Sequence, residues 1–215
     1  MSWWVKLIAF IFKPWPRLWV RALGLPLGFL WFDVFRFRRE IVLDNLSQAF
    51  PDWAQERKIK TGRRSVYSLM GNFFEYFLIP SIDEKWMRKN VIFEGEDNLK
   101  NALEEKKGVL LLSLHLGNGD LMANCVSRRG YKPWLITTFF QHPQMNRFWF
   151  SVRGAQGVQY IAAHGEKTPF TILKALKDNN VVGFVLDQHM GKPFGLKTTF
   201  FGRPAGTAYG LALFH

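Results

Sequence analysis

A histidine and an aspartate separated by four residues are the pair best suited to chemistry in this sequence. His115 and Asp120 lie in the segment GVLLLSLHLGNGD at 108–120, where two glycines flank Asn118. The apolar run before His115 is short enough for a fully buried strand. A carboxylate that accepts a hydrogen bond from one imidazole nitrogen fixes the tautomer and leaves the other nitrogen free as a base. We therefore predict that His115 is a general base and that Asp120 orients it.

Each member of the pair also has a purely structural interpretation. Asp120 would be a good N-cap for a helix expected from Leu121 to Arg129, and His115 could be a buried, hydrogen-bonded imidazole. The spacing alone is a weak motif. Ligands in open α/β sheets, however, collect at the carboxyl ends of strands. We interpret the pair as functional, and the N-cap role is compatible with that interpretation.

Further candidates follow other apolar runs. Asp187 and His189 end the run at Val181–Leu186, so a metal site of His115, Asp120, Asp187 and His189 is conceivable. The sequence contains no strong ligand spacing such as HExxH or paired CxxC, so we expect neither a metal nor a cofactor. Arg153, in SVRGAQG, is either a clamp for phosphate or carboxylate or a surface arginine.

The elements that would hold these residues alternate between strands and helices from about residue 91. Expected strands are Val91–Phe93, Val109–Leu114, Trp134–Phe139, Val158–Ile161 and Val181–Leu186. Expected helices are Asn98–Lys106, Leu121–Arg129, Gln144–Arg153 and Thr168–Lys177. The alternation predicts an α/β fold, a single domain with a largely parallel central sheet flanked by helices.

A long helix is expected before this domain, from about Ala54 to Ile79. Six apolar residues recur along it at helical spacing: Val66, Leu69, Met70, Phe73, Phe74 and Phe77. Such a stripe is typical of core packing. A groove for an acyl chain would need the same residues, so the pattern does not separate the two.

Residues 1–32 form an aromatic-rich segment that we expect to associate with membranes, ahead of an α/β domain at 33–215. Its cations fall on one face at 100° per residue: Lys6, Lys13, Arg17 and Arg21. The longest uncharged run, Ala22–Phe32, is eleven residues, whereas a spanning helix needs about 20. Pro14 and Pro16 should break the helix. The pattern predicts an amphipathic helical segment in the membrane interface; a signal peptide, a tilted span and a helix packed on the domain are the alternatives.

The charge balance points to anionic partners. The chain carries 29 Lys and Arg against 17 Asp and Glu, a net charge of +12, and residues 1–40 alone carry +5. An anionic membrane surface, an acidic protein or phosphorylated substrate, and nucleic acid all fit. The sequence has no recognised nucleic-acid-binding motif, so we expect no nucleic-acid partner. The single cysteine, Cys125, excludes an intrachain disulfide.

Six segments in order make this chain resemble a known family. LLSLHLGNGD resembles the HX4D/E motif of the lysophospholipid acyltransferase superfamily, and its surroundings resemble the lipid A biosynthesis (lauroyl/myristoyl) acyltransferases. The segments are RREIVLDNLSQAFP at 38–51, EGEDNLKNAL at 94–103, HLGNGD at 115–120, VRGAQGV at 152–158, LKDNNVVGFVLDQ at 176–188 and TTFFGRPAGTAYG at 198–210. Many members carry a tryptophan and a glutamate in place of Gly119 and Asp120. The family also continues past Thr207–Gly210, so we expect the chain to be truncated at its C-terminus.

The resemblance implies an enzyme that moves a fatty acyl chain from a thioester, acyl carrier protein or acyl-CoA, to a hydroxyl of a lipid A precursor or a related phosphorylated glycolipid. It places the protein at the cytoplasmic face of the bacterial inner membrane, peripheral or with a single anchor. It also assigns Arg153 and Asp187 to the substrate site, where we expect Gly117 and Asn118 to contact the substrate as well. The backbone N–H groups at Gly117, Asn118 and Gly119 are candidate oxyanion donors. Alternatives are a non-catalytic membrane-bound lipid-binding protein with the same fold and an acyltransferase for a different lysolipid or glycolipid.

Overall fold

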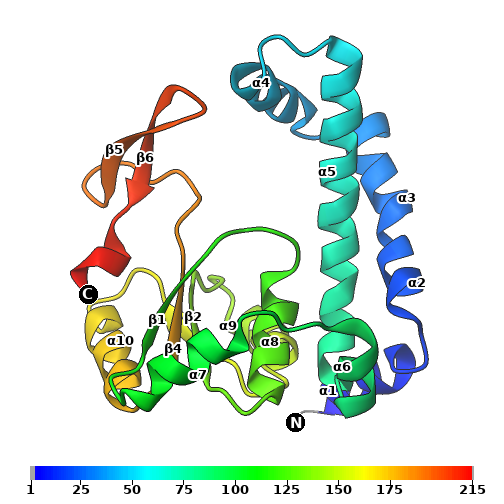
Figure 1. The fold of residues 1–215 in the computed structure, drawn as a ribbon. Coiled ribbons are helices and arrows are strands. Elements are labelled where there is room, and N and C mark those ends of the chain that lie inside the picture. The colour runs from blue at the N-terminus through cyan, green and yellow to red at the C-terminus, as the bar shows by residue number, and fades with distance from the viewer. Residues whose placement is uncertain (1–2, 215) are drawn as a thin grey trace.

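The computed structural model describes residues 3–214, and its α/β part is built on a four-stranded parallel sheet (Figure 1). The strands lie in the order β1-β4-β2-β3, with bounds β1 Val109–Ser113, β2 Pro133–Thr137, β3 Gln159–Ala162 and β4 Val181–Val185. Gly183 of the central strand β4 pairs with Leu111 of β1 on one side and Leu135 of β2 on the other. The predicted α/β fold with a parallel sheet is confirmed.

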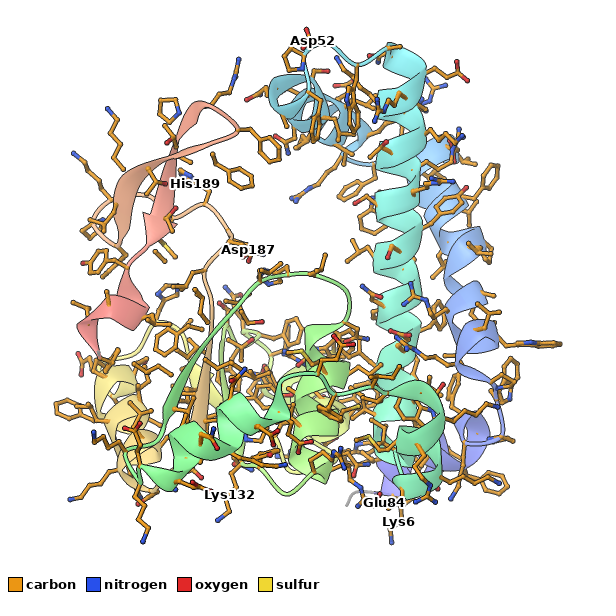
Figure 2. The ribbon with its side chains drawn as sticks, in the orientation of Figure 1. Lys6, Asp52, Glu84, Lys132, Asp187 and His189 are labelled. Atoms are coloured by element: carbon orange, nitrogen blue, oxygen red, sulfur yellow. The ribbon has the colours of Figure 1, made fainter. Side chains whose placement is uncertain are left out.

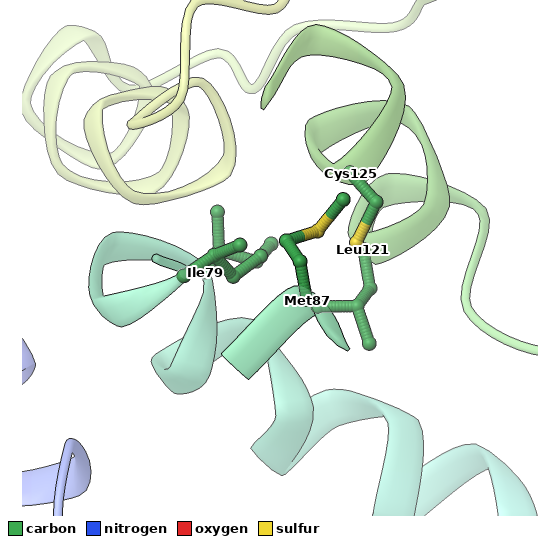
Figure 3. Close-up of a cluster of buried hydrophobic side chains, with 5 residues drawn as sticks. Ile79, Met87, Leu121 and Cys125 are labelled. Atoms are coloured by element: carbon green, nitrogen blue, oxygen red, sulfur yellow. The ribbon is translucent and has the colours of Figure 1, made fainter. Parts of the chain in front are cut away.

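Helices cover the sheet and close two apolar clusters. Their bounds are α6 Glu84–Asn90, α7 Glu96–Glu104, α8 Gly119–Arg128, α9 Pro143–Arg153 and α10 Thr168–Lys177. One cluster packs α8 against α6 and the 3₁₀ helix η2, Tyr76–Ser81, and consists of Ile79, Ile82, Met87, Leu121 and Cys125 (Figure 3). The other packs α10 against the sheet and consists of Ile161, Ile172, Ala175, Val182 and Phe184. The first cluster anchors α8, whose first turn carries Asp120.

The N-terminal third is helical and is organised along α5, Gln55–Glu75, which stands beside the α/β part (Figure 1). The other elements of this part are α1 Trp3–Phe12, α2 Arg17–Ala22, α3 Gly24–Phe29, the π-helix η1 Leu30–Val34 and α4 Arg39–Ala49. The predicted break at Pro14 and Pro16 is confirmed, because α1 ends before them and α2 begins after them. A Cβ on Gly24 would lie 2.4 Å from the backbone nitrogen of Gly71, so only glycine allows α3 to approach α5 this closely.

This N-terminal part buries some of its apolar side chains and exposes others. It buries Val5, Val20 and Phe32, and the boundary expected at residue 32 falls inside η1. Its exposed large apolar side chains include Trp3, Phe10, Leu18, Trp19 and Phe35. Among residues 3–214, no single helix is both long and apolar enough to cross a bilayer; by length and composition alone, the bent pair Arg17–Val34 and Arg39–Ala49, at 83°, passes that test.

Two segments of the α/β part differ from the sequence-based prediction. The strand expected at Val91–Phe93 is wrong: this stretch is not in a strand, and Val91 and Phe93 pack their side chains against the Ile79 cluster. An antiparallel hairpin, β5 Gly195–Phe200 and β6 Arg203–Ala208, was not predicted. It leads into the short 3₁₀ helix η3, Gly210–Leu213, and lies beyond the carboxyl edge of the sheet (Figure 1).

Candidate active site

The carboxyl ends of the neighbouring strands β1 and β4 bring His115 and Asp187 together. The Nδ1 atom of His115 lies 2.7 Å from Oδ1 of Asp187, and the backbone N–H of His115 donates to Oδ2 of Asp187 at 2.8 Å. The contact follows from the register, because Ser113 of β1 pairs with Val185 of β4 and each residue follows its strand by two positions. Figure 2 shows Asp187 beside the loop that leaves β1.

The double contact with Asp187 sets the protonation of the His115 ring. Partial burial pushes the pKa of Asp187 upward, but hydrogen bonds from the His115 amide and ring outweigh it, so that pKa lies below its ordinary value. An ionised Asp187 can only accept, so Nδ1 carries the proton and Nε2 is the basic nitrogen. This arrangement is the one that a general base requires.

Asp120 has a different partner. In the residues described here, its carboxylate makes no hydrogen bond to His115; Oδ1 instead accepts from Arg153, 2.9 Å from Nε and 2.7 Å from Nη2. The hydroxyl of Tyr76 donates to Oδ2 at 3.0 Å, and that of Tyr160 to Oδ1 at 3.3 Å. The predicted contact between Asp120 and His115 is therefore replaced by a buried ion pair, and the catalytic role of Asp120 stays a prediction.

The ion pair of Asp120 and Arg153 lies in an aromatic setting. The Arg153 guanidinium stacks over the rings of Phe150 and Tyr160, 5.0 and 4.8 Å from their centroids. Burial, reinforced by the charge of Asp120, raises the pKa of both Tyr76 and Tyr160 far above the ordinary value, so both remain protonated donors. Arg153 is thus held rigidly and is not the surface arginine of the alternative interpretation.

The loop between β1 and α8, residues 114–118, is fixed by Asn118. Its Oδ1 accepts from the backbone N–H of Leu121, so Asn118 is the N-cap of α8 and the cap expected at Asp120 is wrong. Its Nδ2 donates to the backbone oxygen of Asn72 and to Glu75 on α5. Gly117 adopts φ +72°, a conformation that favours glycine, and its carbonyl accepts from Asn72. The substrate contacts predicted for Gly117 and Asn118 stay predictions.

A cavity of about 1690 Å³ opens around these residues. It runs between α5 and the sheet, and its polar lining includes His115, Asp120 and Arg153. Its apolar lining includes Leu69, Met70, Phe73, Leu111, Leu135, Ile136, Phe184 and Phe214. The stripe on α5 is therefore divided: Val66 is buried, whereas Leu69 and Phe73 are exposed toward this space. Pockets for drug-sized ligands measure about 300–1000 Å³, so this one has room for larger molecules.

A known protein family matches the whole chain, and individual relatives match most of it. The family model for bacterial lipid A biosynthesis acyltransferases matches residues 1–215. The chain belongs to this family. It is 26% identical over 205 residues to the lipid A biosynthesis palmitoleoyltransferase of Escherichia coli (strain K12) and to the lipid A biosynthesis acyltransferase of Shigella flexneri, alignments that cover 86% of this chain and 66% of each relative. It is 27% identical over 153 residues to the phosphatidylinositol mannoside acyltransferase of Mycolicibacterium smegmatis, covering 68% of this chain and 50% of the relative.

The chain therefore spans about two thirds of the length of the first two relatives and half of the third. His189 is hydrogen-bonded within the hairpin, where its Nδ1 accepts from the backbone N–H of Gly206 (Figure 2). Among residues 3–214, no group of three or more His, Cys, Asp or Glu is arranged to hold a metal ion. Burial raises the pKa of the Cys125 thiol to about 11, so this cysteine is a poor nucleophile at neutral pH.

The sequence did not reveal three polar residues at or next to the candidate site. Tyr76 and Tyr160, which hold Asp120, lie at the end of the apolar stripe and in the edge strand β3, where aromatic residues indicate packing. Glu75 lies in the sequence among the apolar residues of the same stripe and was not singled out. A signal did exist for Glu75, because an acid among the apolar residues of an amphipathic helix requires a partner if it is buried.

Proposed function

We propose that this protein transfers a fatty acyl chain from a thioester to a hydroxyl of a lipid A precursor or related glycolipid, with His115 as general base. The observation that carries the proposal is the His115–Asp187 pair at the edge of a cavity whose walls are largely apolar. The family membership and the acyltransferase names of the relatives support it.

In the proposed reaction, Nε2 of His115 takes the proton of the acceptor hydroxyl as its oxygen attacks the thioester carbonyl. A C–O bond forms, the C–S bond breaks, and the departing thiolate recovers the proton from the imidazolium. Asp187 stabilises that imidazolium, and general-base catalysis of this kind contributes about 10²–10⁴-fold. No covalent acyl-enzyme is required. Backbone N–H groups at Gly117–Gly119 are the proposed oxyanion donors.

Arg153 and Asp120 would act as a unit within the substrate site. Both line the cavity, and Asp120 fixes the guanidinium of Arg153 from one side while two aromatic rings hold its faces. A rigid guanidinium suits a phosphate or a carbonyl oxygen. We propose that Arg153 contacts a substrate phosphate or acyl carbonyl and that Asp120 positions it.

The proposed donor is acyl carrier protein or acyl-CoA, and the proposed acceptor is phosphorylated, so both partners are anionic. A chain with a net charge of +12 would attract them and also the anionic cytoplasmic leaflet of the inner membrane. Of the four cations at 1–32, Arg17 and Arg21 turn inward to Glu75 and Lys13 pairs with Asp83. Membrane association at the cytoplasmic face would therefore depend more on exposed apolar side chains than on a basic stripe.

Substituting an exposed aromatic residue of α1 should weaken membrane binding without unfolding the protein. Phe10 is 80% exposed, so Phe10→Ser should leave the melting temperature unchanged. It should lower the affinity for anionic vesicles about 10-fold, because burial of a large apolar side chain contributes at least about 1.5 kcal/mol. Vesicle co-sedimentation at two salt concentrations measures the effect, and binding should weaken with salt.

The matched control for this membrane test is Phe170→Ser on α10. Phe170 is 73% exposed and lies outside the N-terminal segment. If Phe170→Ser weakens vesicle binding as much as Phe10→Ser does, the N-terminal segment is not the membrane-binding surface.

The proposed function is tested by incubating the protein with a radiolabelled acyl thioester and a lipid A precursor in mixed micelles. The wild-type protein should form an acylated glycolipid, and the His115→Ala protein should not. Binding of the acyl chain and acceptor without transfer by either protein would instead identify a non-catalytic lipid-binding protein. Acyl transfer from acyl carrier protein and from acyl-CoA, compared in parallel, identifies the donor.

A further inference from the structure

Glu75 connects the N-terminal helices to the β1–α8 loop across α5. This side chain is fully buried, and its two carboxylate oxygens serve opposite neighbours. Oε1 lies 2.6 Å from Nε of Arg17 and 3.2 Å from Nη1 of Arg21, both on α2. Oε2 accepts from Nδ2 of Asn118, the N-cap of α8, at 3.2 Å.

Asn72, one turn earlier on α5, makes a parallel connection. Its Oδ1 accepts from Nη1 of Arg21 at 2.9 Å, and its Nδ2 donates to the carbonyl of Gly117 at 3.0 Å. Its own carbonyl accepts from Nδ2 of Asn118 at 3.1 Å. The loop between His115 and Asp120 is thus hydrogen-bonded, at Gly117 and Asn118, to the side chains of Asn72 and Glu75, and both of these side chains also bind arginines of α2.

The energetics of this cluster favour a fixed loop. A fully buried carboxylate is costly unless charged and hydrogen-bonded partners surround it, and here two arginines and an amide do so. Arg21 is shared between Glu75 and Asn72, so displacing α2 from α5 weakens both connections at once. By contrast, much of the loop is exposed: Leu114 and Leu116 are 54% and 81% exposed, so their apolar side chains do little to pack the loop in place.

We propose that Glu75 is a positioning residue for catalysis, which sets the β1–α8 loop, and with it the proposed oxyanion donors after His115, according to how α2 is seated on α5. This inference rests on the proposed function. Leu18 and Trp19 are exposed on α2 between its two arginines. If the N-terminal helices bind a membrane as proposed above, contact at these two side chains would couple membrane binding to the geometry of the loop.

The Asn118→Asp protein separates positioning from helix capping. Asp caps a helix about as well as Asn, so α8 should be retained. Asp cannot donate to Glu75 or to the carbonyl of Asn72, and its charge faces the carboxylate of Glu75. We expect kcat to fall about 10- to 100-fold with little change in KM, because a small displacement of catalytic groups costs that much. An unchanged kcat would reduce Asn118 to a helix cap and overturn the proposal.

The connection through α2 is tested with Arg21→Gln against Lys6→Gln. Both variants remove one positive charge from the N-terminal helices, but Lys6 is exposed on α1 and lies far from Glu75 in the sequence and on another helix. Arg17 remains beside Glu75 in the Arg21→Gln protein, so the fold should persist. We expect Arg21→Gln to lower kcat at least about 10-fold and Lys6→Gln to leave it unchanged.

Hydrogen–deuterium exchange of the peptide at 114–121 gives a readout independent of activity. Exchange should be about 10-fold faster in Arg21→Gln than in Lys6→Gln, the effect of losing hydrogen bonds to a charged group. Equal exchange and equal kcat in the two variants would overturn the coupling while leaving the proposed function intact. If the wild-type protein transfers no acyl group, the proposed function fails, and the exchange comparison alone decides whether α2 fixes the loop.

Discussion

The Asp187→Asn protein should turn over at least about 100-fold more slowly than the wild type, with a nearly unchanged melting temperature. Both groups that face Asp187 are donors, the backbone N–H and the ring Nδ1–H of His115. An asparagine offers one oxygen and one NH2 group, so one of these donors must face another donor. The ring can avoid this clash by moving its proton to Nε2, and Nε2 is then no longer a base.

The fold should survive this substitution because the side chain of Asp187 is 36% exposed, and ion pairs of exposed side chains contribute little to stability. Turnover at saturating substrate and thermal unfolding measured on the same preparation check both statements. Asp178→Asn, the same change at an exposed site outside the cavity, is the control. His115→Ala combined with Asp187→Asn should be scarcely slower than His115→Ala alone, since the two residues act as one unit. If the loss of turnover in the double variant equals the product of the two single losses, the two residues do not act as a dyad.

The order of strands and helices was predictable because apolar residues are spaced differently in the two kinds of element and because particular residues end each of them. The apolar runs at 109–114 and 181–186 became the neighbouring strands β1 and β4, and α10 begins and ends at the predicted residues. The strand prediction at Val91–Phe93 was wrong because a run of three apolar residues does not show whether a neighbouring strand is present to pair with it. The hairpin β5–β6 was missed because its residues lack the strong alternation of a half-buried strand.

The partner of His115 was not predictable from spacing. Asp120 is close to His115 in the sequence, but the turn at Gly117 and the cap at Asn118 carry Asp120 into the first turn of α8. Asp187 is 72 residues away in the sequence and reaches His115 only through the register of β1 with β4. Strand order is a tertiary property, which local patterns do not encode. The sequence thus predicted which residues gather at the sheet edge, but not which of them touch.

The main expected effect of Asp120→Asn is a loss of stability. Asp120 is buried and neutralises Arg153, so the amide leaves a buried guanidinium without its counter-charge. Breaking a buried pair in this way costs about 3–5 kcal/mol. For a chain of this size, the melting temperature should fall by roughly 10 °C or more. Thermal unfolding followed by circular dichroism measures the shift.

The companion variants show whether the unpaired charge is the cause. Asp120→Glu keeps the negative charge opposite Arg153 and should be more stable than Asp120→Asn, although the longer side chain must repack. Adding Arg153→Gln to Asp120→Asn removes both charges and should recover much of the lost melting temperature, because two neutral groups need no counter-charge. If Asp120 instead orients His115 directly, as the sequence predicts, Asp120→Asn should melt like the wild type and lose turnover, and the added Arg153→Gln should recover nothing. The melting temperature of the double variant therefore decides which residue Asp120 serves.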